Sequence, residues 1–144
     1  MYNIITYIMI INKIKTDNIR LLKTFINLNN STFFRYYDTR DITIIKNHLI
    51  TIIITNNDEI VGYGHLDIEN HVWLGICVLE KHKGNGYGKK IMNHLINYAI
   101  ENNIEYICLS VDKNNTIAKN MYDKFNFKVI QTNKKTYLMK KTLI

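Results

Sequence analysis

The stretch Lys83-Gly84-Asn85-Gly86-Tyr87-Gly88 decides how this chain folds around a ligand. The apolar run Trp73-Leu74-Gly75-Ile76-Cys77-Val78 precedes it, and an amphipathic segment that starts at Lys89 follows it. Glycine permits sharp turns and a close approach of the backbone to a ligand, because it has no Cβ. The first amides of a helix lack partners within the helix and carry the positive end of its dipole. A strand, a glycine-rich turn and a helix start therefore predict a cradle for a pyrophosphate group.

The spacing of the glycines separates the known phosphate loops. A Walker A loop needs Gly, four residues and then Gly-Lys-Ser/Thr, but Lys83 replaces the first Gly and Lys90 replaces Ser or Thr. A dinucleotide fingerprint needs Gly-x-Gly-x-x-Gly, whereas Gly84, Gly86 and Gly88 are each two residues apart. The remaining pattern is a basic residue, two residues, Gly, one residue and Gly. This pattern resembles the acyl-CoA loop of the GNAT superfamily of N-acetyltransferases.

A second segment strengthens this resemblance. The stretch Asn115-Thr116-Ile117-Ala118-Lys119-Asn120-Met121-Tyr122-Asp123-Lys124-Phe125-Asn126-Phe127 resembles the Asn-x-x-Ala…Tyr…Gly-Phe block of that family. Two departures stand out. Lys83 replaces the usual Gln or Arg, which keeps a charge but loses the planar fork of Arg. Asn126 replaces the usual Gly, and Asn is the next best residue at a positive φ.

The pattern of apolar residues predicts the order of elements. Strands are expected at 4–14, 51–55, 60–68, 71–79, 106–111, 127–131 and 136–141, and helices at 17–28 with Asp17 as cap, 41–48 with Asp41 as cap, 89–102 and 115–124. This order favours a mixed α/β sheet. The resemblance implies an α/β (α+β) fold with a mixed, mostly antiparallel sheet of about seven strands and about four helices. It also implies a single N-acetyltransferase domain over residues 1–144.

Composition narrows the class of protein. The chain has 144 residues, of which 47% are hydrophobic, and a formal net charge of +7, which suits a polyanionic ligand. Its two cysteines, Cys77 and Cys108, indicate a reducing interior, and no Cys/His cluster has zinc spacing. The apolar stretch 4–11 is too short to span a membrane. We therefore expect a soluble, cytoplasmic protein without a metal.

The resemblance implies acetyl-CoA as the acyl donor and direct attack by a primary amine. The residues it assigns to acetyl-CoA are Ile76, Cys77, Val78, Lys83, Gly84, Asn85, Gly86, Tyr87, Gly88, Lys89, Asn115 and Tyr122. The amide of Val78 would polarise the thioester carbonyl. Tyr122 would give a proton to the departing thiolate; the alternative is that it is only a core residue. Asn115 would contact the CoA arm or cap a helix.

A base must remove a proton from the acceptor ammonium. His65 has a suitable intrinsic pKa, and strand alternation places it on one face with Tyr63 and Asp67. The alternative for His65 is a half-exposed surface residue. Weaker candidates are Asp67, Glu80 and His71, and a water relay is a further option. Cys77 lies in an apolar run without a triad pattern, so we interpret it as a core residue.

The aromatic segment Phe33-Phe34-Arg35-Tyr36-Tyr37, with Arg40, lies where this family shapes its acceptor pocket. Aromatic rings stack on bases or sugars and arginines hold a diphosphate, which favours a nucleotide-linked amino sugar as acceptor. The predicted acceptor residues are Phe34, Arg35, Tyr36, His65 and Trp73. Competing interpretations are a peptide or protein N-acetyltransferase, a non-catalytic CoA-binding module and a small nucleic-acid-binding domain, the last of which leaves the second motif unexplained. A homodimer is a further expectation.

Overall fold

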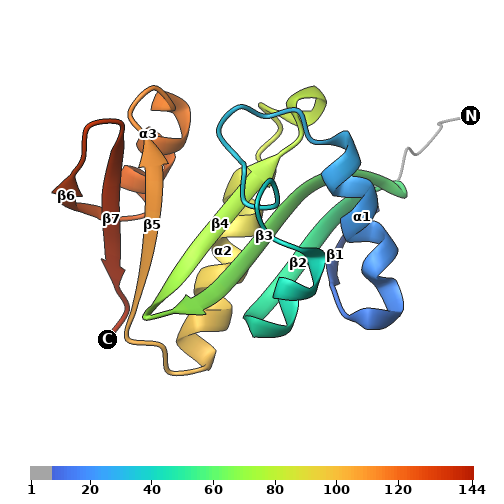
Figure 1. Cartoon of the computed structure of the whole chain (residues 1–144), viewed down its shortest axis with the longest axis horizontal. Coiled ribbons are helices and arrows are strands. Elements are labelled where there is room, and N and C mark those ends of the chain that lie inside the picture. Colours follow the sequence, from blue (N-terminus) through green and yellow to red (C-terminus); the bar gives the residue numbers. More distant parts are fainter. Residues whose placement is uncertain (1–7) are drawn as a thin grey trace, which may run out of the picture.

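The computed structural model describes residues 8–144, which form one mixed sheet of seven strands in the order β1-β2-β3-β4-β5-β7-β6 (Figure 1). The strands are β1 Met9–Lys13, β2 His48–Asn56, β3 Glu59–Glu69, β4 His71–Val78, β5 Tyr106–Asp112, β6 Lys128–Thr132 and β7 Thr136–Thr142. The α-helices are α1 Ile19–Leu28, α2 Tyr87–Glu101 and α3 Thr116–Lys124, and short 3-10 helices lie at η1 Thr16–Asn18, η2 Ile42–Asn47 and η3 Glu80–His82. Only β4 and β5 are parallel neighbours within this part of the chain. The predicted mixed, mostly antiparallel sheet is confirmed.

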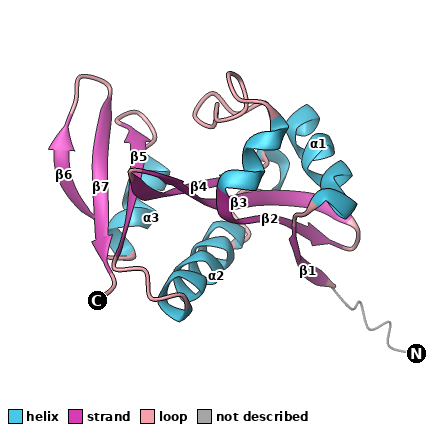
Figure 2. Ribbon diagram, turned by 60° about the horizontal axis from the view of Figure 1, so that its bottom comes forward, coloured by secondary structure: helices cyan, strands magenta, loops and turns pink. Residues whose placement is uncertain are grey.

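Helices cover both faces of the sheet (Figure 2). The apolar stripe of α2, which includes Ile91 and Leu95, packs with α3 against one face. On the other face Leu22 and Phe25 of α1 are fully buried against Ile53 and other strand residues. Alternation along each strand divides the side chains between these two cores.

The β2–β3 ribbon is a hairpin whose register shifts at two places, between His48 and Ile50 and between Ile54 and Thr55. The seven central residues of β2, positions 49–55, are all Ile, Thr or Leu. The β-branched side chains of Ile and Thr suit a pleated, buried surface. The two-residue turn between the strands has Asn57 at φ 50° and Asp58 at φ 66°. Positive φ at both positions is the requirement of the type I′ hairpin turn, which Asn and Asp tolerate.

The sheet opens between β4 and β5 (Figure 1). These strands pair only at Trp73 and Cys108, and from there they diverge toward their carboxyl ends. The glycine turn that leads to α2 follows β4, and α3 follows β5. The start of each of these helices therefore lies at the wide end of the gap.

Several predicted boundaries differ from the structure. The first strand was predicted over 4–14; its part at 4–7 lies outside the described residues, and the strand itself is Met9–Lys13. The prediction that Asp17 caps the first helix is wrong, because Asp17 lies within η1 and α1 begins at Ile19 after Asn18. The Asp41 cap is correct, since its carboxylate accepts a hydrogen bond from the Thr43 amide, but the element is a 3-10 helix. Among residues 8–144 no helix is long and apolar enough to cross a membrane.

Candidate active site

The edge of β4 that faces the gap presents free backbone groups. Leu79 lies opposite Val61 and its amide donates to the Val61 carbonyl at 2.9 Å. In an antiparallel pair, alternate residues bond to the partner strand and the others point away from it. The register therefore directs the amides and carbonyls of Ile76 and Val78 away from β3 and toward β5. Because β5 has already diverged there, this segment of β4 can receive an added strand-like ligand.

The glycine turn leaves the start of α2 open. Gly84 and Gly86 both have φ of 82°, and a Cβ at either position would meet nothing within 4 Å. Gly86 is the N-cap of α2 and has no side chain to occupy the first free amides. Gly88 lies in the first turn and allows close packing on α3, since a Cβ there would lie 3.2 Å from the Met121 sulfur. The arrangement suits an anion held by backbone amides at the positive end of a 15-residue helix.

Several polar side chains of this turn already form hydrogen bonds or an ion pair within the protein. Asn85 folds back and donates to the carbonyl of His82 at 3.0 Å, so its side chain shapes the turn. The Lys83 ammonium pairs with the Glu80 carboxylate at 2.7 Å, and its side chain is 47% exposed. An exposed pair of this kind is weak and exchangeable, so the Lys83 charge remains available to an anion. The Tyr87 hydroxyl accepts a hydrogen bond from Asn56 at 2.7 Å.

Asn115 caps α3. Its Oδ1 accepts a hydrogen bond from the Ala118 amide at 3.3 Å, which is the geometry of an N-cap. Of the two roles that its residue type permits, capping is therefore observed. At the other end of α3, Asn126 has φ of 64° and the Phe127 amide bonds to the Tyr122 carbonyl at 3.0 Å. Asn thus fills the position where the family uses Gly.

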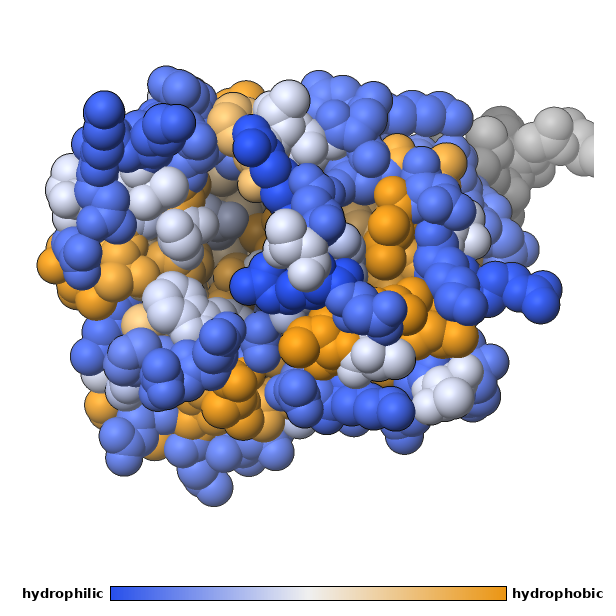
Figure 3. All heavy atoms as spheres, viewed as in Figure 1, coloured by the Kyte–Doolittle hydropathy of each residue, from blue (hydrophilic) through white to orange (hydrophobic). Residues whose placement is uncertain are grey.

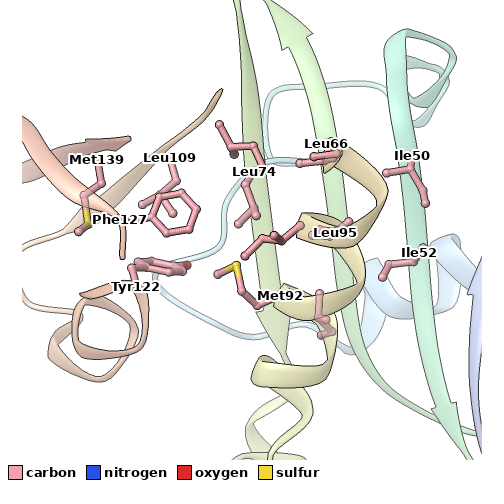
Figure 4. Close-up of a cluster of buried hydrophobic side chains, with 14 of the residues drawn as sticks. Ile50, Ile52, Leu66, Leu74, Met92, Leu95, Leu109, Tyr122, Phe127 and Met139 are labelled. Atoms are coloured by element: carbon pink, nitrogen blue, oxygen red, sulfur yellow. The ribbon is translucent and has the colours of Figure 1, made fainter. Parts of the chain in front are cut away.

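Tyr122 extends from α3 toward the gap (Figure 4). Its ring packs on Phe127 at a centroid distance of 6.0 Å and the residue is only 7% exposed. None of the hydrogen bonds among residues 8–144 involves its hydroxyl, which therefore remains available to a ligand. Burial raises the pKa of Tyr122 well above its usual value, and the nearby Cys77 raises it further. The hydroxyl therefore stays protonated and can donate a hydrogen bond into the gap.

A pocket of about 530 Å³ lies on the opposite face of the sheet and reaches the same gap. Figure 3 shows this face hollowed beside hydrophilic residues. The pocket is lined by Phe33, Phe34, Arg35, Tyr36, Arg40, His65, Asp67, Glu69, Asn70, Trp73, Leu74, Gly75 and Ser110. All five residues that the sequence predicted around the acceptor belong to this set. The structure adds Glu69, Asn70, Gly75 and Ser110, which carry no motif and become neighbours only when β3, β4 and β5 are aligned.

His65 lies beneath this pocket and not on the surface. It is 2% exposed and lies opposite Gly75 of β4 in the sheet. Its Nδ1 atom is hydrogen-bonded to the Tyr63 hydroxyl at 2.6 Å. A Cβ at Gly75 would lie 2.5 Å from the His65 ring, so only glycine leaves room for the imidazole. Burial holds the pKa of His65 well below its usual value, and His48 and Arg40 lower it further. The ring is therefore neutral at pH 7, and the half-exposed alternative is wrong.

A second polar chain lies beside His65. The Tyr36 hydroxyl donates to the Asp67 carboxylate at 2.8 Å and lies 2.7 Å from His48 Nε2. A carboxylate only accepts, so the single hydrogen of the Tyr36 hydroxyl is used in the bond to Asp67. His48 must therefore donate from Nε2 to the Tyr36 oxygen. A neutral His48 then accepts at Nδ1 from the Thr51 hydroxyl, 2.7 Å away. Burial lowers the pKa of His48 to about 4, which agrees with this neutral tautomer. Asp67 is 6% exposed and is held in place by this chain.

Both arginines of the pocket already have contacts. The Arg40 guanidinium lies 4.2 Å from the centre of the Tyr36 ring and donates to the Tyr36 carbonyl at 3.2 Å. Arg35 Nε donates to the Thr32 carbonyl at 2.7 Å. Both side chains are exposed and keep further N–H groups for a ligand.

The remaining candidate bases lie outside the pocket. Glu80 pairs with Lys83, and His71 bonds to the Tyr106 hydroxyl at 2.7 Å in an exposed position. Cys77 is 7% exposed, and burial raises the pKa of its thiol to about 12, so it stays protonated. This supports a core role and argues against a nucleophile. No group of three or more His, Cys, Asp or Glu residues within 8–144 could hold a metal ion.

Comparison with known proteins identifies the class. Residues 18–127 match the model of the Acetyltransferase (GNAT) family, and the chain therefore belongs to this family. The "Uncharacterized N-acetyltransferase YobR" of Bacillus subtilis (strain 168) is 32% identical over 99 residues, which cover 69% of this chain and 34% of that protein. The chain thus spans about a third of the length of this curated relative.

Solved structures share the fold. An acetyltransferase of the GNAT family from Streptococcus pneumoniae has a TM-score of 0.78 at 19% identity, covering 94% of this chain and 99% of that one. Arabidopsis thaliana Naa50, solved with the bisubstrate analogue CoA-Ac-MVNAL, has a TM-score of 0.74 at 23% identity, with coverage of 94% and 99%. The predicted membership of the GNAT family is confirmed.

Proposed function

We propose that this chain transfers the acetyl group of acetyl-CoA to the primary amine of a small molecule by direct attack in a ternary complex. One observation carries the proposal: the pocket and the open edge of β4 share a boundary. Trp73, Leu74 and Gly75 line the pocket, and the free amides of Ile76 and Val78 follow directly along the strand. A thioester bound along β4 would therefore face an amine that enters from the pocket.

The donor would be held at two places. The pyrophosphate would lie on the amides from Gly84 to Lys89, where the turn is open, with Lys83 nearby as a cation. The pantetheine arm would pair with the backbone at 76–78. Asn115 would act by fixing the start of α3 and hence the position of Tyr122.

Three groups would divide the chemistry. The Val78 amide would stabilise negative charge on the thioester oxygen as the amine attacks. His65, which lines the pocket, would accept a proton at Nε2, because its Nδ1 is hydrogen-bonded to the Tyr63 hydroxyl. Tyr122 would donate to the departing thiolate. Removal of the Tyr122 hydroxyl should then lower kcat with little change in the KM of the acceptor.

For the acceptor we propose a nucleotide-linked amino sugar. Phe34 and Tyr36 supply stacking surfaces, and the free N–H groups of Arg35 and Arg40 would hold the diphosphate. The competing acceptor is a peptide amine, because Naa50, whose fold is similar, was solved with a peptide-bearing bisubstrate analogue. We further propose that residues 1–144 form one domain and that the protein forms a homodimer. The free cysteines favour a reducing compartment as its place of work.

The test is acetyl-CoA-dependent product formation, read by mass spectrometry over a panel of amines. The panel contains nucleotide-linked amino sugars, free amino sugars, polyamines, amino acids and short peptides. Acetylation of the nucleotide-linked sugars alone is the expected result. Acetylation of peptides alone would contradict the proposed acceptor but support the proposed acetyl transfer. Absence of any product, together with absence of thermal stabilisation by acetyl-CoA, would overturn the proposed reaction.

A further inference from the structure

The end of the β2–β3 hairpin contacts the glycine turn on both of its flanks. Asn56 and Glu59 lie opposite each other in the last pair of this hairpin, so their side chains project from one face of the ribbon. Asn56 Nδ2 donates to the Tyr87 hydroxyl at 2.7 Å, in the first turn of α2. A carboxylate only accepts, so His82 Nε2 donates to Glu59 Oε1 at 3.1 Å on the other flank. Residues 83–86 therefore run between two points that one hairpin holds.

The two flanking side chains also contact each other. The His82 and Tyr87 rings meet edge to face, with a centroid distance of 6.4 Å and an interplanar angle of 82°. Asn85, inside the turn, donates to the His82 carbonyl at 3.0 Å. The His82 side chain is 17% exposed, whereas Lys81, which also pairs with Glu59, is 78% exposed. Because an exposed ion pair contributes little, the bond to His82 is the one through which Glu59 fixes the turn.

The conformational freedom of the turn explains why such anchors matter. Gly84 and Gly86 belong to the residue type with the largest backbone freedom, so ordering them on a ligand costs conformational entropy. A binding site that is ordered before its ligand arrives avoids this cost. Both hairpin bonds end on side-chain atoms, of Tyr87 and of His82, and so they leave the backbone amides of the turn available.

We propose that Asn56 and Glu59 are positioning residues for acetyl-CoA, which hold the glycine turn in the conformation that receives the pyrophosphate. This inference rests on the proposed place of the pyrophosphate on the amides from Gly84 to Lys89. Neither positioning residue touches the ligand; each acts through the side chain that it holds, across 31 and 23 residues of sequence.

Calorimetric titration with acetyl-CoA, without any acceptor amine, tests the proposal. Asn56→Ala and Glu59→Ala should each raise the Kd of acetyl-CoA about 3-fold to 10-fold, because the turn must then be ordered during binding. Asn56→Ala should do so with little loss of thermal stability. The Asn56 Oδ1 atom is buried without a hydrogen-bond partner in the described part of the chain, so its removal relieves a cost. A lower melting temperature with native affinity would show a merely structural role and overturn the proposal.

The structure offers matched variants for both flanks. Tyr87→Phe should reproduce the effect of Asn56→Ala, and the two changes combined should weaken binding no further, since they remove one shared bond. Tyr98→Phe is the control, because it deletes a hydroxyl bond of the same helix, to the Leu49 carbonyl at 3.0 Å, and should leave the Kd unchanged. Glu59→Gln keeps an acceptor oxygen for its histidine partner and should restore most of the affinity that Glu59→Ala loses.

The ligand-free protein provides a second readout. Nitrogen-15 relaxation should show greater backbone mobility at Gly84 and Gly86 in Glu59→Ala than in the native chain. Native Kd in both Asn56→Ala and Glu59→Ala, or an equal loss of affinity in Tyr98→Phe, would overturn the positioning role while leaving the donor site in place. Failure of the native chain to bind acetyl-CoA would instead overturn the proposed donor site, and this inference with it.

Discussion

Gly75 is the position where one added methyl group tests the site most sharply. A Cβ there would lie 2.5 Å from Cε1 and 2.6 Å from Nε2 of His65. Carbon atoms pack at about 3.5 Å or more, so the imidazole must move by about 1 Å in Gly75→Ala. Overpacking of this kind costs about 1–3 kcal/mol of stability. A misplacement of about 1 Å in a catalytic group lowers kcat about 100-fold.

Gly64→Ala is the matched control for this prediction. Its Cβ would also approach a neighbour to 2.5 Å, but that neighbour is Ile91 of α2 on the other face of the sheet. Urea unfolding should show that both variants lose stability, whereas steady-state acetylation should show that only Gly75→Ala loses kcat. Equal loss of kcat in both variants would mean that general destabilisation, and not the position of His65, explains the effect. Native kcat in Gly75→Ala would refute the role of His65 outright.

Three further predictions concern the acid, the glycine turn and pH. Tyr122→Phe should lower kcat about 10-fold or more while the melting temperature changes little, because the ring keeps its packing; an unchanged kcat would remove Tyr122 from the chemistry. Gly86→Ala should cost about 1 kcal/mol, because φ is 82° there, and should weaken acetyl-CoA binding in calorimetry; native affinity would place the pyrophosphate elsewhere. Folding lowers the pKa of His48 from 6.5 to about 4, so the unfolded chain binds more protons between these values. The contribution of His48 to the free energy of unfolding should therefore be fully present above pH 6.5 and decrease as the pH falls toward 4. In urea titrations at several pH values, His48→Gln should show a smaller decrease over this range. The same pH dependence in the variant and the native chain would show that His48 is not responsible.

The motifs predicted the local backbone geometry of the glycine turn and of the end of α3, because such geometry depends on residues close in sequence. The alternating glycines predicted a sharp turn, and in that turn Gly84 and Gly86 both have φ of 82°. Asn126 was predicted to replace Gly at a positive φ, and it has φ of 64°. Period-two alternation also placed His65 and Asp67 on one face of a strand, as observed.

The pocket was predicted only in outline, because its contacts join distant parts of the chain. Tyr36 bonds to Asp67 across 31 residues, and His48 bonds to Tyr36 across 12. No local pattern encodes such pairs. The depth of His65 was also missed, since its burial depends on Gly75 in the next strand and on the aromatic segment above it.

The abundance of Asn has a structural use that composition alone did not reveal. Four asparagines, Asn57, Asn70, Asn103 and Asn126, have positive φ in the described part of the chain, where glycine is the common choice. Asn103 ends α2, and the following Ile104 amide bonds back to the Ala99 carbonyl at 3.0 Å. Asn therefore terminates helices and forms turns in a chain that has only six glycines.

The central claim is that acetyl-CoA lies along β4 and on the start of α2. Amide NMR during titration with acetyl-CoA tests it directly, since each backbone N–H reports its own environment. The account predicts saturable shifts at Ile76, Val78 and the amides from Gly84 to Lys89, with β1 and β6 unaffected. Shifts confined to other strands, or no shifts at saturating acetyl-CoA, would contradict it.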